Sequence, residues 1–260
     1  MSTDQNRHDE FFVGYLPTPQ RVRRFAIAAS ISLVAGAALV GIVVASMQQS
    51  PGMGTWDTST ATTFDGLALV DPYAMLRVKD TTASGGVSTI LLVSEGKFGA
   101  ADRIRPFHGK AVRIRGTILR RDGRRMLEVS SEDNAVELLN PRESALSELA
   151  PAPRSEMESP VSLRGEMIDP KCYIGAMKPG GGKTHKACAQ LCVGGGIPPM
   201  FVTRDSKGRE SYFLVVLQDG SAANEAAIPF LGDPTEIIGE LELRGDLNVL
   251  RIDPKKIVRL

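Results

Sequence analysis

The sequence lacks the features that mark nucleic-acid-binding proteins. Lys and Arg number 31 against 30 Asp and Glu, which gives a formal net charge of +1, and aromatic residues make up only 5% of the chain. A dedicated nucleic-acid binder usually carries a basic excess on one face, and a single-strand binder needs aromatic side chains on which bases stack. The composition therefore predicts no nucleic-acid partner.

Several catalytic and cofactor motifs are missing as well. The segment GGGKT (180–184) resembles the end of a phosphate-binding loop, but that pattern requires glycine where the chain has Met177, so no nucleotide is expected. The motif C-x-x-C, typical of thiol oxidoreductases, does not occur, and neither does C-x-x-C-H, the motif that attaches haem covalently. No Ser-His-Asp set and no carboxylate pair can be assigned. The sequence therefore favours a non-enzymatic protein, and no catalytic residue is named.

Charge is absent from one long apolar run near the N-terminus. Phe25–Met47 contains no charged residue and is long enough to cross a hydrocarbon core of ~30 Å as a helix. Four arginines precede it, and no Lys or Arg follows it until Arg77. The positive-inside rule then places the N-terminus in the cytoplasm and residues 48–260 outside it, with the lipid bilayer as one partner. We favour an uncleaved anchor over the alternative, a cleaved signal peptide.

The external part contains an internal repeat. PFHGKAVRIRGTILRRDGRRMLEV, from Pro106, aligns without a gap with PFLGDPTEIIGELELRGDLNVLRI, from Pro229. Each copy shows the period-2 pattern of half-buried strands, the first with an Asp-Gly hairpin turn. Gly66 and Gly165 are candidates for a bend in the first strand of each copy. Four to five short strands per copy predict an OB-like small barrel, with a β-sandwich as the alternative.

The predicted fold is therefore mostly β, with one N-terminal transmembrane helix followed by two tandem OB-like β-barrels. The predicted parts are a cytoplasmic tail (1–22), the transmembrane helix (23–47), a linker (48–63), barrel 1 (64–140), a second linker (141–160), and barrel 2 (161–260) with a Cys/His insertion (170–200).

The insertion carries the candidate site, because it holds every cysteine of the chain. Thr184 is predicted to cap a helix HKACAQLC, on which His185, Cys188 and Cys192 have the spacing i, i+3 and i+7 and so share one face. Cys172 comes from the end of the preceding strand and can close over that face. The resulting Cys3His set is predicted to bind a metal, with zinc or copper suited to thiolate and imidazole donors.

Three other interpretations of the insertion remain open. Outside the cytoplasm thiols tend to oxidise, so Cys172 can form a disulfide with Cys188 or Cys192. In that case no cofactor is expected, and the protein is a purely structural or interaction subunit. Axial ligation of haem by His185 or a cysteine is less favoured than zinc or copper. A thiol-dependent redox enzyme is the third possibility.

The layout of one N-terminal anchor followed by an exported OB-like barrel resembles that of the haem chaperone of bacterial cytochrome c maturation. That family has a single barrel and a haem-binding histidine in its C-terminal tail, whereas the barrel here is doubled and the tail PKKIVRL has no histidine. The cysteine segment is similar to that of uncharacterised bacterial membrane-anchored proteins. The resemblance is one of layout only. From the predicted anchor, the two barrels and the Cys/His loop together, we expect a periplasmic accessory protein on the bacterial inner membrane, or a subunit of a membrane-associated redox complex.

Overall fold

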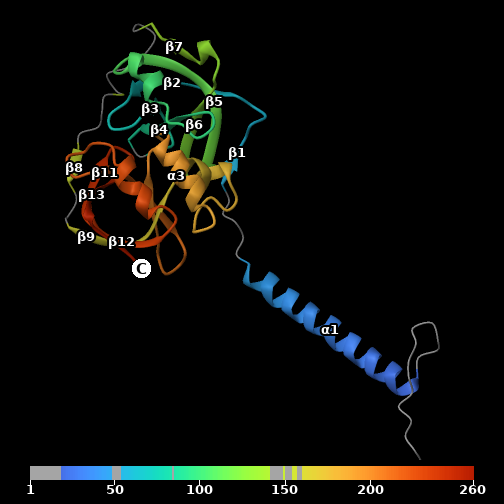
Figure 1. The fold of residues 1–260 in the computed structure, drawn as a ribbon. Helices are drawn as coiled ribbons and strands as arrows, with labels where there is room; N and C mark the ends of the chain where they lie inside the picture. The colour runs from blue at the N-terminus through green and yellow to red at the C-terminus, as the bar shows by residue number, and fades with distance from the viewer. Residues whose placement is uncertain (1–18, 49–53, 84, 141–148, 150–153, 157–159) are drawn as a thin grey trace, which may run out of the picture. The chain divides into compact units, whose positions relative to one another are not determined.

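The structure is a computed structural model that describes residues 19–48, 54–83, 85–140, 149, 154–156 and 160–260. The chain divides into two compact units, Met1–Ser50 and Pro51–Leu260, and each is described by itself. Figure 1 shows both units and their elements. The expected cytoplasmic tail lies outside the described residues up to residue 18. The same holds for residues 49–53 of the first linker and for residues 141–148, 150–153 and 157–159 of the second.

The first unit contains one helix, α1 (Gln20–Met47), among its described residues. It begins three positions before the predicted start and ends where Gln48 turns to an extended conformation, with φ −71° and ψ 121°. The helix is long and apolar enough to cross a membrane, and none of its residues is buried. The structure thus provides one candidate membrane span.

The second unit is built mainly of strands. Its described strands are β1 (Thr55–Trp56), β2 (Thr62–Leu69), β3 (Met75–Lys79), β4 (Val87–Ser94), β5 (Ala111–Arg121), β6 (Arg124–Val129), β7 (Val136–Leu138), β8 (Arg154–Glu156), β9 (Val161–Ile168), β10 (Met200–Arg204), β11 (Glu210–Leu217), β12 (Pro234–Arg244) and β13 (Leu247–Arg259). Its described helices and helical turns are α2 (Ala101–Ile104), η1 (Arg105–Phe107), η2 (Asp133–Ala135), η4 (Cys172–Ala176, a π-helical turn), α3 (Lys186–Gly194), α4 (Asn224–Ala227) and η5 (Ile228–Phe230).

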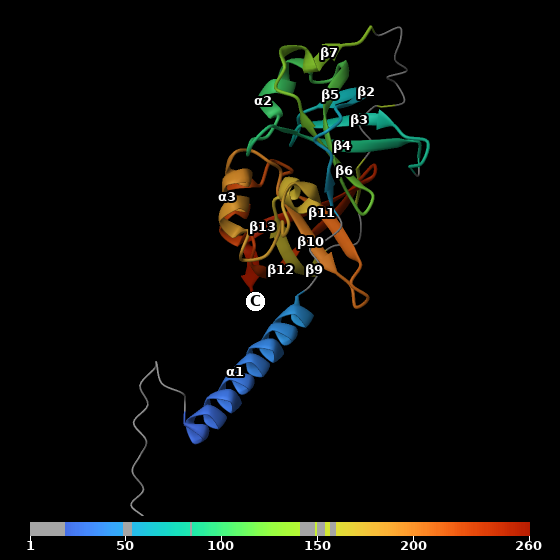
Figure 2. The ribbon, with the colours of Figure 1, turned by 90° about the vertical axis from the view of Figure 1, so that its right-hand side faces the viewer.

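Two sets of five strands close on themselves. In the first set β2–β3, β3–β4, β5–β6 and β2–β5 pair antiparallel, and β4–β6 pair parallel. In the second set β9–β10, β10–β11, β12–β13 and β9–β12 pair antiparallel, and β11–β13 pair parallel. In each set a short helix and a 3-10 turn follow the third strand. These cyclic pairings confirm the predicted fold of OB-like barrels, which Figures 1 and 2 show in blue-green to green and in yellow to red.

Glycines bend the first strand of each barrel. β2 pairs with β5 up to Leu67 and with β3 from Leu67 onward, and β9 changes partner in the same way at Gly165 and Glu166. A Cβ at Gly66 would lie 2.3 Å from the Arg77 carbonyl oxygen, and one at Gly165 would lie 2.1 Å from that of Val202. The predicted bends are confirmed, because only a residue without a side chain allows these strands to approach so closely.

Three hydrophobic clusters fill the second unit. One lies inside barrel 1 and one inside barrel 2. The third joins the two barrels, because it combines side chains such as Met75 and Leu119 from barrel 1 with Ile174 and Met200 from barrel 2. Cys172 and Cys192 are part of this third cluster. The cysteine segment is therefore packed between the barrels rather than extended into solvent.

The structure differs from the sequence-based organisation in three places. β1 and the start of β2 lie in the segment expected as the first linker, and β1 pairs with β5 through Thr55 and Trp56. β8 lies in the segment expected as the second linker and pairs with β12. Helix α3 has His185 at its N-cap without a side-chain cap, so Thr184 does not cap it. The reason is a preceding turn, in which the His185 N–H donates to the Gly182 carbonyl at 2.9 Å.

Candidate metal centre

The site begins where β9 ends. Asp169 follows the strand, and its Oδ1 accepts the Lys171 N–H at 2.9 Å while its carbonyl accepts the Tyr173 N–H at 3.0 Å. These bonds start the π-helical turn that carries Cys172. Gly180 then passes directly over that turn, since a Cβ there would lie 2.4 Å from the Cys172 carbonyl oxygen. The local backbone thus holds the carboxylate and the first thiol close together.

Helix α3 supplies the other donors. His185 stands at its N-cap, Cys188 lies one turn further along, and Cys192 lies in its last turn. The regular helix places the three on one side, as the spacing predicts. The Cys192 carbonyl accepts the Ile197 N–H at 3.1 Å, which fixes the chain after the helix. Helix α3 ends at Gly194, and Gly196 follows with φ 94°.

The structure places the four predicted residues in two overlapping groups of possible metal donors. The donor atoms of Cys172, His185 and Cys188 all lie within 4.8 Å of one another, as do those of Asp169, Cys172 and Cys192. Cys172 belongs to both groups and is therefore the centre of the cluster. The sequence analysis missed Asp169, although its place directly before Pro170 and Lys171, at the end of a predicted strand, was a usable signal.

The cluster is shielded from solvent and holds polar atoms without partners. Cys172 and His185 are 5% exposed, Cys192 is 1% exposed and Asp169 is 0% exposed. Asp169 Oδ2 and His185 Nε2 lie 3.9 Å apart, and neither has a hydrogen-bond partner among the described residues. Leaving buried polar atoms unpaired is costly. A bound cation would satisfy such a set of donors.

Burial and neighbouring groups shift the acidities in this cluster. The pKa of the Cys172 thiol is raised far above its usual value by its hydrogen bond with Cys192, by burial and by the Asp169 charge. Burial would raise the pKa of Asp169, yet the net shift is downward because His185 and the Cys172 and Cys192 thiols stabilise the carboxylate. Without a bound cation, the carboxylate is therefore the group that carries the negative charge, and Cys172 stays protonated.

Barrel 1 completes the site. Lys97, in the loop between β4 and α2, donates from Nζ to Cys188 Sγ at 2.7 Å, and this contact raises the pKa of Lys97. Lys171 Nζ reaches the same loop, with bonds to the Ser94 and Gly96 carbonyls at 2.9 and 2.7 Å. It also forms a buried ion pair with Glu128 at 2.6 Å. Two lysines thus link the cysteine cluster to the other barrel.

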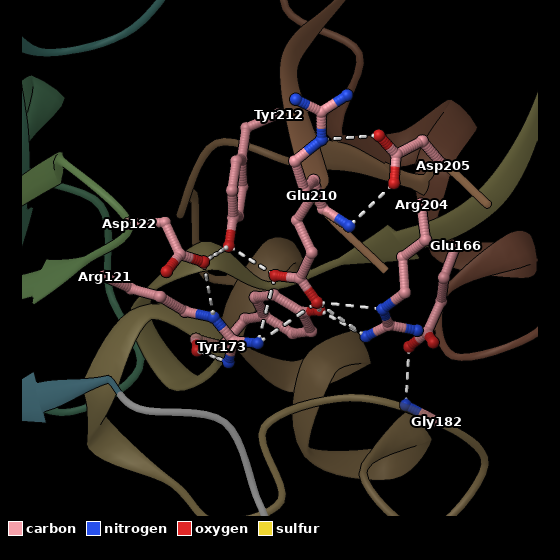
Figure 3. A network of polar contacts seen from close by, with 10 residues as sticks. Arg121, Asp122, Glu166, Tyr173, Gly182, Arg204, Asp205, Glu210 and Tyr212 are labelled. Carbon is pink, nitrogen blue, oxygen red and sulfur yellow. Dashed lines mark hydrogen bonds and ion pairs between the residues drawn. The ribbon is translucent and has the colours of Figure 1, made fainter. Parts of the chain in front are cut away.

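A network of polar contacts surrounds Tyr173, the residue next to Cys172, as Figure 3 shows. Glu210 is its centre: it accepts the Tyr173 hydroxyl at 2.7 Å, Arg204 Nε at 2.9 Å and Arg121 Nη2 at 3.0 Å. The Arg121 guanidinium also stacks over the Tyr173 ring, 4.1 Å from its centroid. Because Tyr173 directly follows the first cysteine and Arg121 belongs to barrel 1, this network fixes the cluster between the barrels.

The three cysteines of the chain, all of them described, are free thiols. The disulfide interpretation of the sequence thus has no counterpart in this structure. The geometry instead gives a Cys/His group that can bind a metal ion. By its fold and site the protein belongs to a definable class: an N-terminal apolar helix joined to two OB-like barrels, the second of which carries a buried Cys/His cluster.

Comparisons with known proteins add little to this class. No protein-family model matches the chain, and no curated protein matches it. Among solved structures, a deletion mutant of the single-stranded DNA binding protein from Thermus aquaticus is similar, with 14% identity and a TM-score of 0.19. The match covers 81% of this chain and 89% of that one. The resemblance to the haem chaperone gains no support from these searches.

One expectation from the composition is contradicted by the comparison. Nucleic acid was excluded as a partner because the net charge is +1 and aromatics are few. The similar solved chain is a single-stranded DNA binding protein, so this exclusion is withdrawn. The physical reason is that composition averages over the chain and does not describe any one face. At a TM-score of 0.19 the similarity carries no argument for a nucleic-acid function of this chain.

Proposed function

We propose that this protein is a membrane-anchored metal-binding protein, with Cys172, His185, Cys188 and Cys192 as the ligands. The observation that supports this most directly is the buried donor cluster around Cys172, in which Asp169 Oδ2 and His185 Nε2 lack partners. Three thiols and one imidazole match a tetrahedral zinc site and are soft enough for copper(I).

Asp169 has a supporting role in this proposal. It faces His185 at 3.9 Å from a fully buried position, and a carboxylate behind a histidine ligand is a common arrangement in metal sites. Such a carboxylate fixes the imidazole ring and increases its basicity. Metal binding would also remove the thiol proton from Cys172, whose raised pKa otherwise keeps it protonated.

The proposed location is the outer face of a bacterial inner membrane. Support comes from α1, which is long and apolar enough to span, and from the arginines that precede its apolar part. In this topology the N-terminus is cytoplasmic and both barrels are periplasmic, where the protein acts as an accessory subunit of a membrane-associated redox complex. Two reporter fusions at the C-terminus test it: an alkaline phosphatase should be active and a green fluorescent protein should be dark.

Metal analysis of the full chain, purified anaerobically in detergent, tests the metal proposal. We expect close to one zinc or copper ion per chain, and loss of that ion when Cys172 and Cys192 are both replaced by serine. Lys207→Met, which changes an exposed lysine in the turn between β10 and β11, is the control and should retain the ion. Sub-stoichiometric metal together with a quantitative disulfide at Cys172 would contradict the proposal.

A second candidate function, thiol redox chemistry, is favoured by one contact. The Lys97 ammonium lies 2.7 Å from the sulfur of Cys188, which is the most accessible of the three thiols. This candidate predicts that metal-free protein catalyses reduction of a disulfide substrate by dithiothreitol and that Cys188→Ser abolishes turnover. A rate equal to that of dithiothreitol alone would eliminate it.

A further inference from the structure

The four donors of the proposed site differ in their access to solvent. Cys172, His185 and Cys192 are buried, with exposed fractions of 5%, 5% and 1%. Cys188 is only half-buried, and it is the donor that lies beside a side chain of the other barrel. An incoming molecule therefore meets Cys188 before any of the other three.

The loop that carries Lys97 is held firmly against α3. The Ser94 N–H donates to the Phe98 carbonyl at 2.9 Å and closes the loop, and the Gly99 N–H donates to the Gly195 carbonyl at 2.9 Å. A Cβ at Gly99 would lie 2.2 Å from the Gly196 carbonyl oxygen, so the two backbones are in direct contact. The backbone of the loop is thus fixed against the end of α3, and from it the Lys97 ammonium reaches Cys188 Sγ at 2.7 Å.

We propose that Cys188 is the exchange ligand of the site, through which the ion enters and leaves, and that its exchange partner is a molecule or protein presenting a thiolate. The inference rests on the proposed metal-binding function. The protein would then carry an ion that it hands on, rather than an ion that only holds its fold together.

The exchange step balances without any redox change. An incoming thiolate forms a bond to the ion while the bond from the ion to Cys188 Sγ breaks. The released Cys188 thiolate then pairs with the Lys97 ammonium, which lies 2.7 Å away in the structure. One thiolate replaces another, so the charge of the ion's ligand set is unchanged. Cys172, Cys192 and His185 hold the ion until a second incoming donor takes it.

Lys97 also favours the approach of the partner. Its side chain is exposed and positively charged, and it stands at the accessible edge of a cluster that would carry net negative charge once its thiols bind the ion. A thiolate is an anion and a soft donor, which is the combination that this edge and a zinc or copper(I) ion both attract. A neutral or hard donor gains less from either feature.

Metal-transfer kinetics test the exchange role. Full-length protein in detergent, loaded with zinc, is mixed with dimercaptosuccinate as the thiol acceptor, and zinc release is followed over time. We expect Lys97→Met to keep the zinc but to slow its transfer by about threefold to fivefold, as for loss of one partly exposed ion pair. Lys97→Arg should restore the rate. Lys183→Met, an exposed lysine in the same insertion, is the matched control and should transfer zinc like the wild type.

A double variant separates this role from general destabilisation. Cys188→Ser should still bind zinc, with affinity lowered by about 10- to 100-fold, and should release it faster than the wild type. Adding Lys97→Met to Cys188→Ser should slow transfer less than Lys97→Met does alone, because the pair that Lys97 stabilises is gone and only its attraction of the partner remains. Additive effects of the two changes would overturn the proposal.

Alkylation of the metal-free protein measures independently how accessible each of the three thiols is. Brief treatment with N-ethylmaleimide, followed by mass spectrometry, should modify Cys188 at least about tenfold faster than Cys172 or Cys192. Faster modification of Cys172 or Cys192 would overturn the exchange role. Stoichiometric zinc with equal transfer rates in wild type and Lys97→Met overturns that role alone, whereas wild-type protein that binds neither zinc nor copper overturns the proposed function itself.

Discussion

The two barrels place the same pair of side chains in opposite environments. An Asp-Pro dipeptide follows the first strand of each, and both aspartates face a histidine, Asp71 with His108 at 4.0 Å and Asp169 with His185 at 3.9 Å. The side chains of the first pair are 85% and 45% exposed, whereas those of the second are 0% and 5% exposed. Water screens the first pair. The second pair is buried among thiols. Its Asp169 Oδ2 and His185 Nε2 atoms have no hydrogen-bond partner in the part of the chain that the structure describes, so a bound ion would be needed to satisfy them.

The connection that follows each aspartate explains this difference. Residues 70–74 join β2 to β3, while residues 169–199 join β9 to β10 and contain the whole cysteine cluster. The short connection contributes Tyr73, which is buried against the other barrel, and the long one contributes Lys171, which pairs with Glu128. Each connection thus contacts the opposite barrel. Of the two, the long connection is the one that contains the cysteine cluster.

The largest effect is expected from Lys171→Met. Its ammonium and the Glu128 carboxylate have side chains that are only 4% and 10% exposed. Removing the cation leaves an uncompensated buried charge, which typically costs about 3–5 kcal/mol. Denaturation in urea at pH 7 measures the loss, with Lys207→Met as an exposed-lysine control. A loss below about 1 kcal/mol would show that the long connection does not depend on barrel 1 for its anchoring.

Glu210→Gln should weaken the polar contacts that hold Tyr173 of the long connection, and the resulting loss of stability should depend on pH. Burial alone would raise the pKa of Glu210, but hydrogen bonds from Tyr212, Tyr173 and Arg204 lower it below its ordinary value. A lowered folded-state pKa stabilises the fold above the unfolded-state pKa of about 4.3, and this contribution is lost as the pH falls through the folded value.

We therefore expect Glu210→Gln to cost about 2–3 kcal/mol at neutral pH, as for lost hydrogen bonds between charged groups. The difference from wild type should shrink on acidification, because the wild-type carboxylate gains a proton as the pH falls through its lowered folded-state pKa. Free energies of unfolding at about pH 7 and pH 3 test this. An equal difference at both values would mean that the Glu210 charge is not what braces Tyr173.

Asp169→Asn addresses the buried member of the compared pair directly. The carboxylate accepts the Lys171 N–H and faces His185, and an amide keeps the shape but removes the charge. We expect a loss of about 2 kcal/mol in stability of the metal-free protein. In the loaded protein, zinc affinity measured by chelator competition should fall by about 10-fold or more. Unchanged affinity would mean that Asp169 does not support a histidine ligand.

Much of the fold could be predicted from sequence because its determinants are local. Period-2 alternation marks the strands, Gly66 and Gly165 mark their bends, and Asp122 and Gly123, with φ of 47° and 75°, form the predicted hairpin turn. β1 was missed because a strand of two residues shows no alternation. The start of α3 was misjudged because a turn at residues 182–185 takes the place of a capped end.

The candidate site likewise combines features that are local in sequence with features that are not. Its cysteines and histidine could be predicted because helical spacing puts three donors on one face and a strand end brings the fourth. The contributions of Lys97 and Glu128 could not, because they depend on which faces of the two barrels meet. Lys97 and Cys188 are 91 positions apart in sequence. Periodicity within one barrel says nothing about its docking on another.

Tyr73→Phe tests how much the contact of the short connection with barrel 2 contributes to stability. The hydroxyl donates to the Val215 carbonyl at 2.7 Å and accepts the Ala223 N–H at 2.8 Å, both in buried surroundings. Phenylalanine fills the same space but leaves both backbone groups unpaired, which costs about 1–2 kcal/mol. Urea denaturation measures it, and hydrogen exchange should locate the loosened amide at Ala223. An unchanged amide would place the loss elsewhere.

The smallest effect is expected from Asp71→Asn, and it tests the comparison itself. Asp71 repeats the position and the histidine contact of Asp169, but its side chain is 85% exposed, and a solvent-exposed polar contact at 4.0 Å contributes little. Its removal should change the free energy of unfolding by less than about 0.5 kcal/mol and leave zinc affinity unchanged. Measured beside Asp169→Asn under identical conditions, it compares two Asp-Pro sites that each face a histidine but differ strongly in burial. If both variants lost the same stability, burial would not be what separates the two aspartates, and the argument that the long connection creates a site would lose its main physical support.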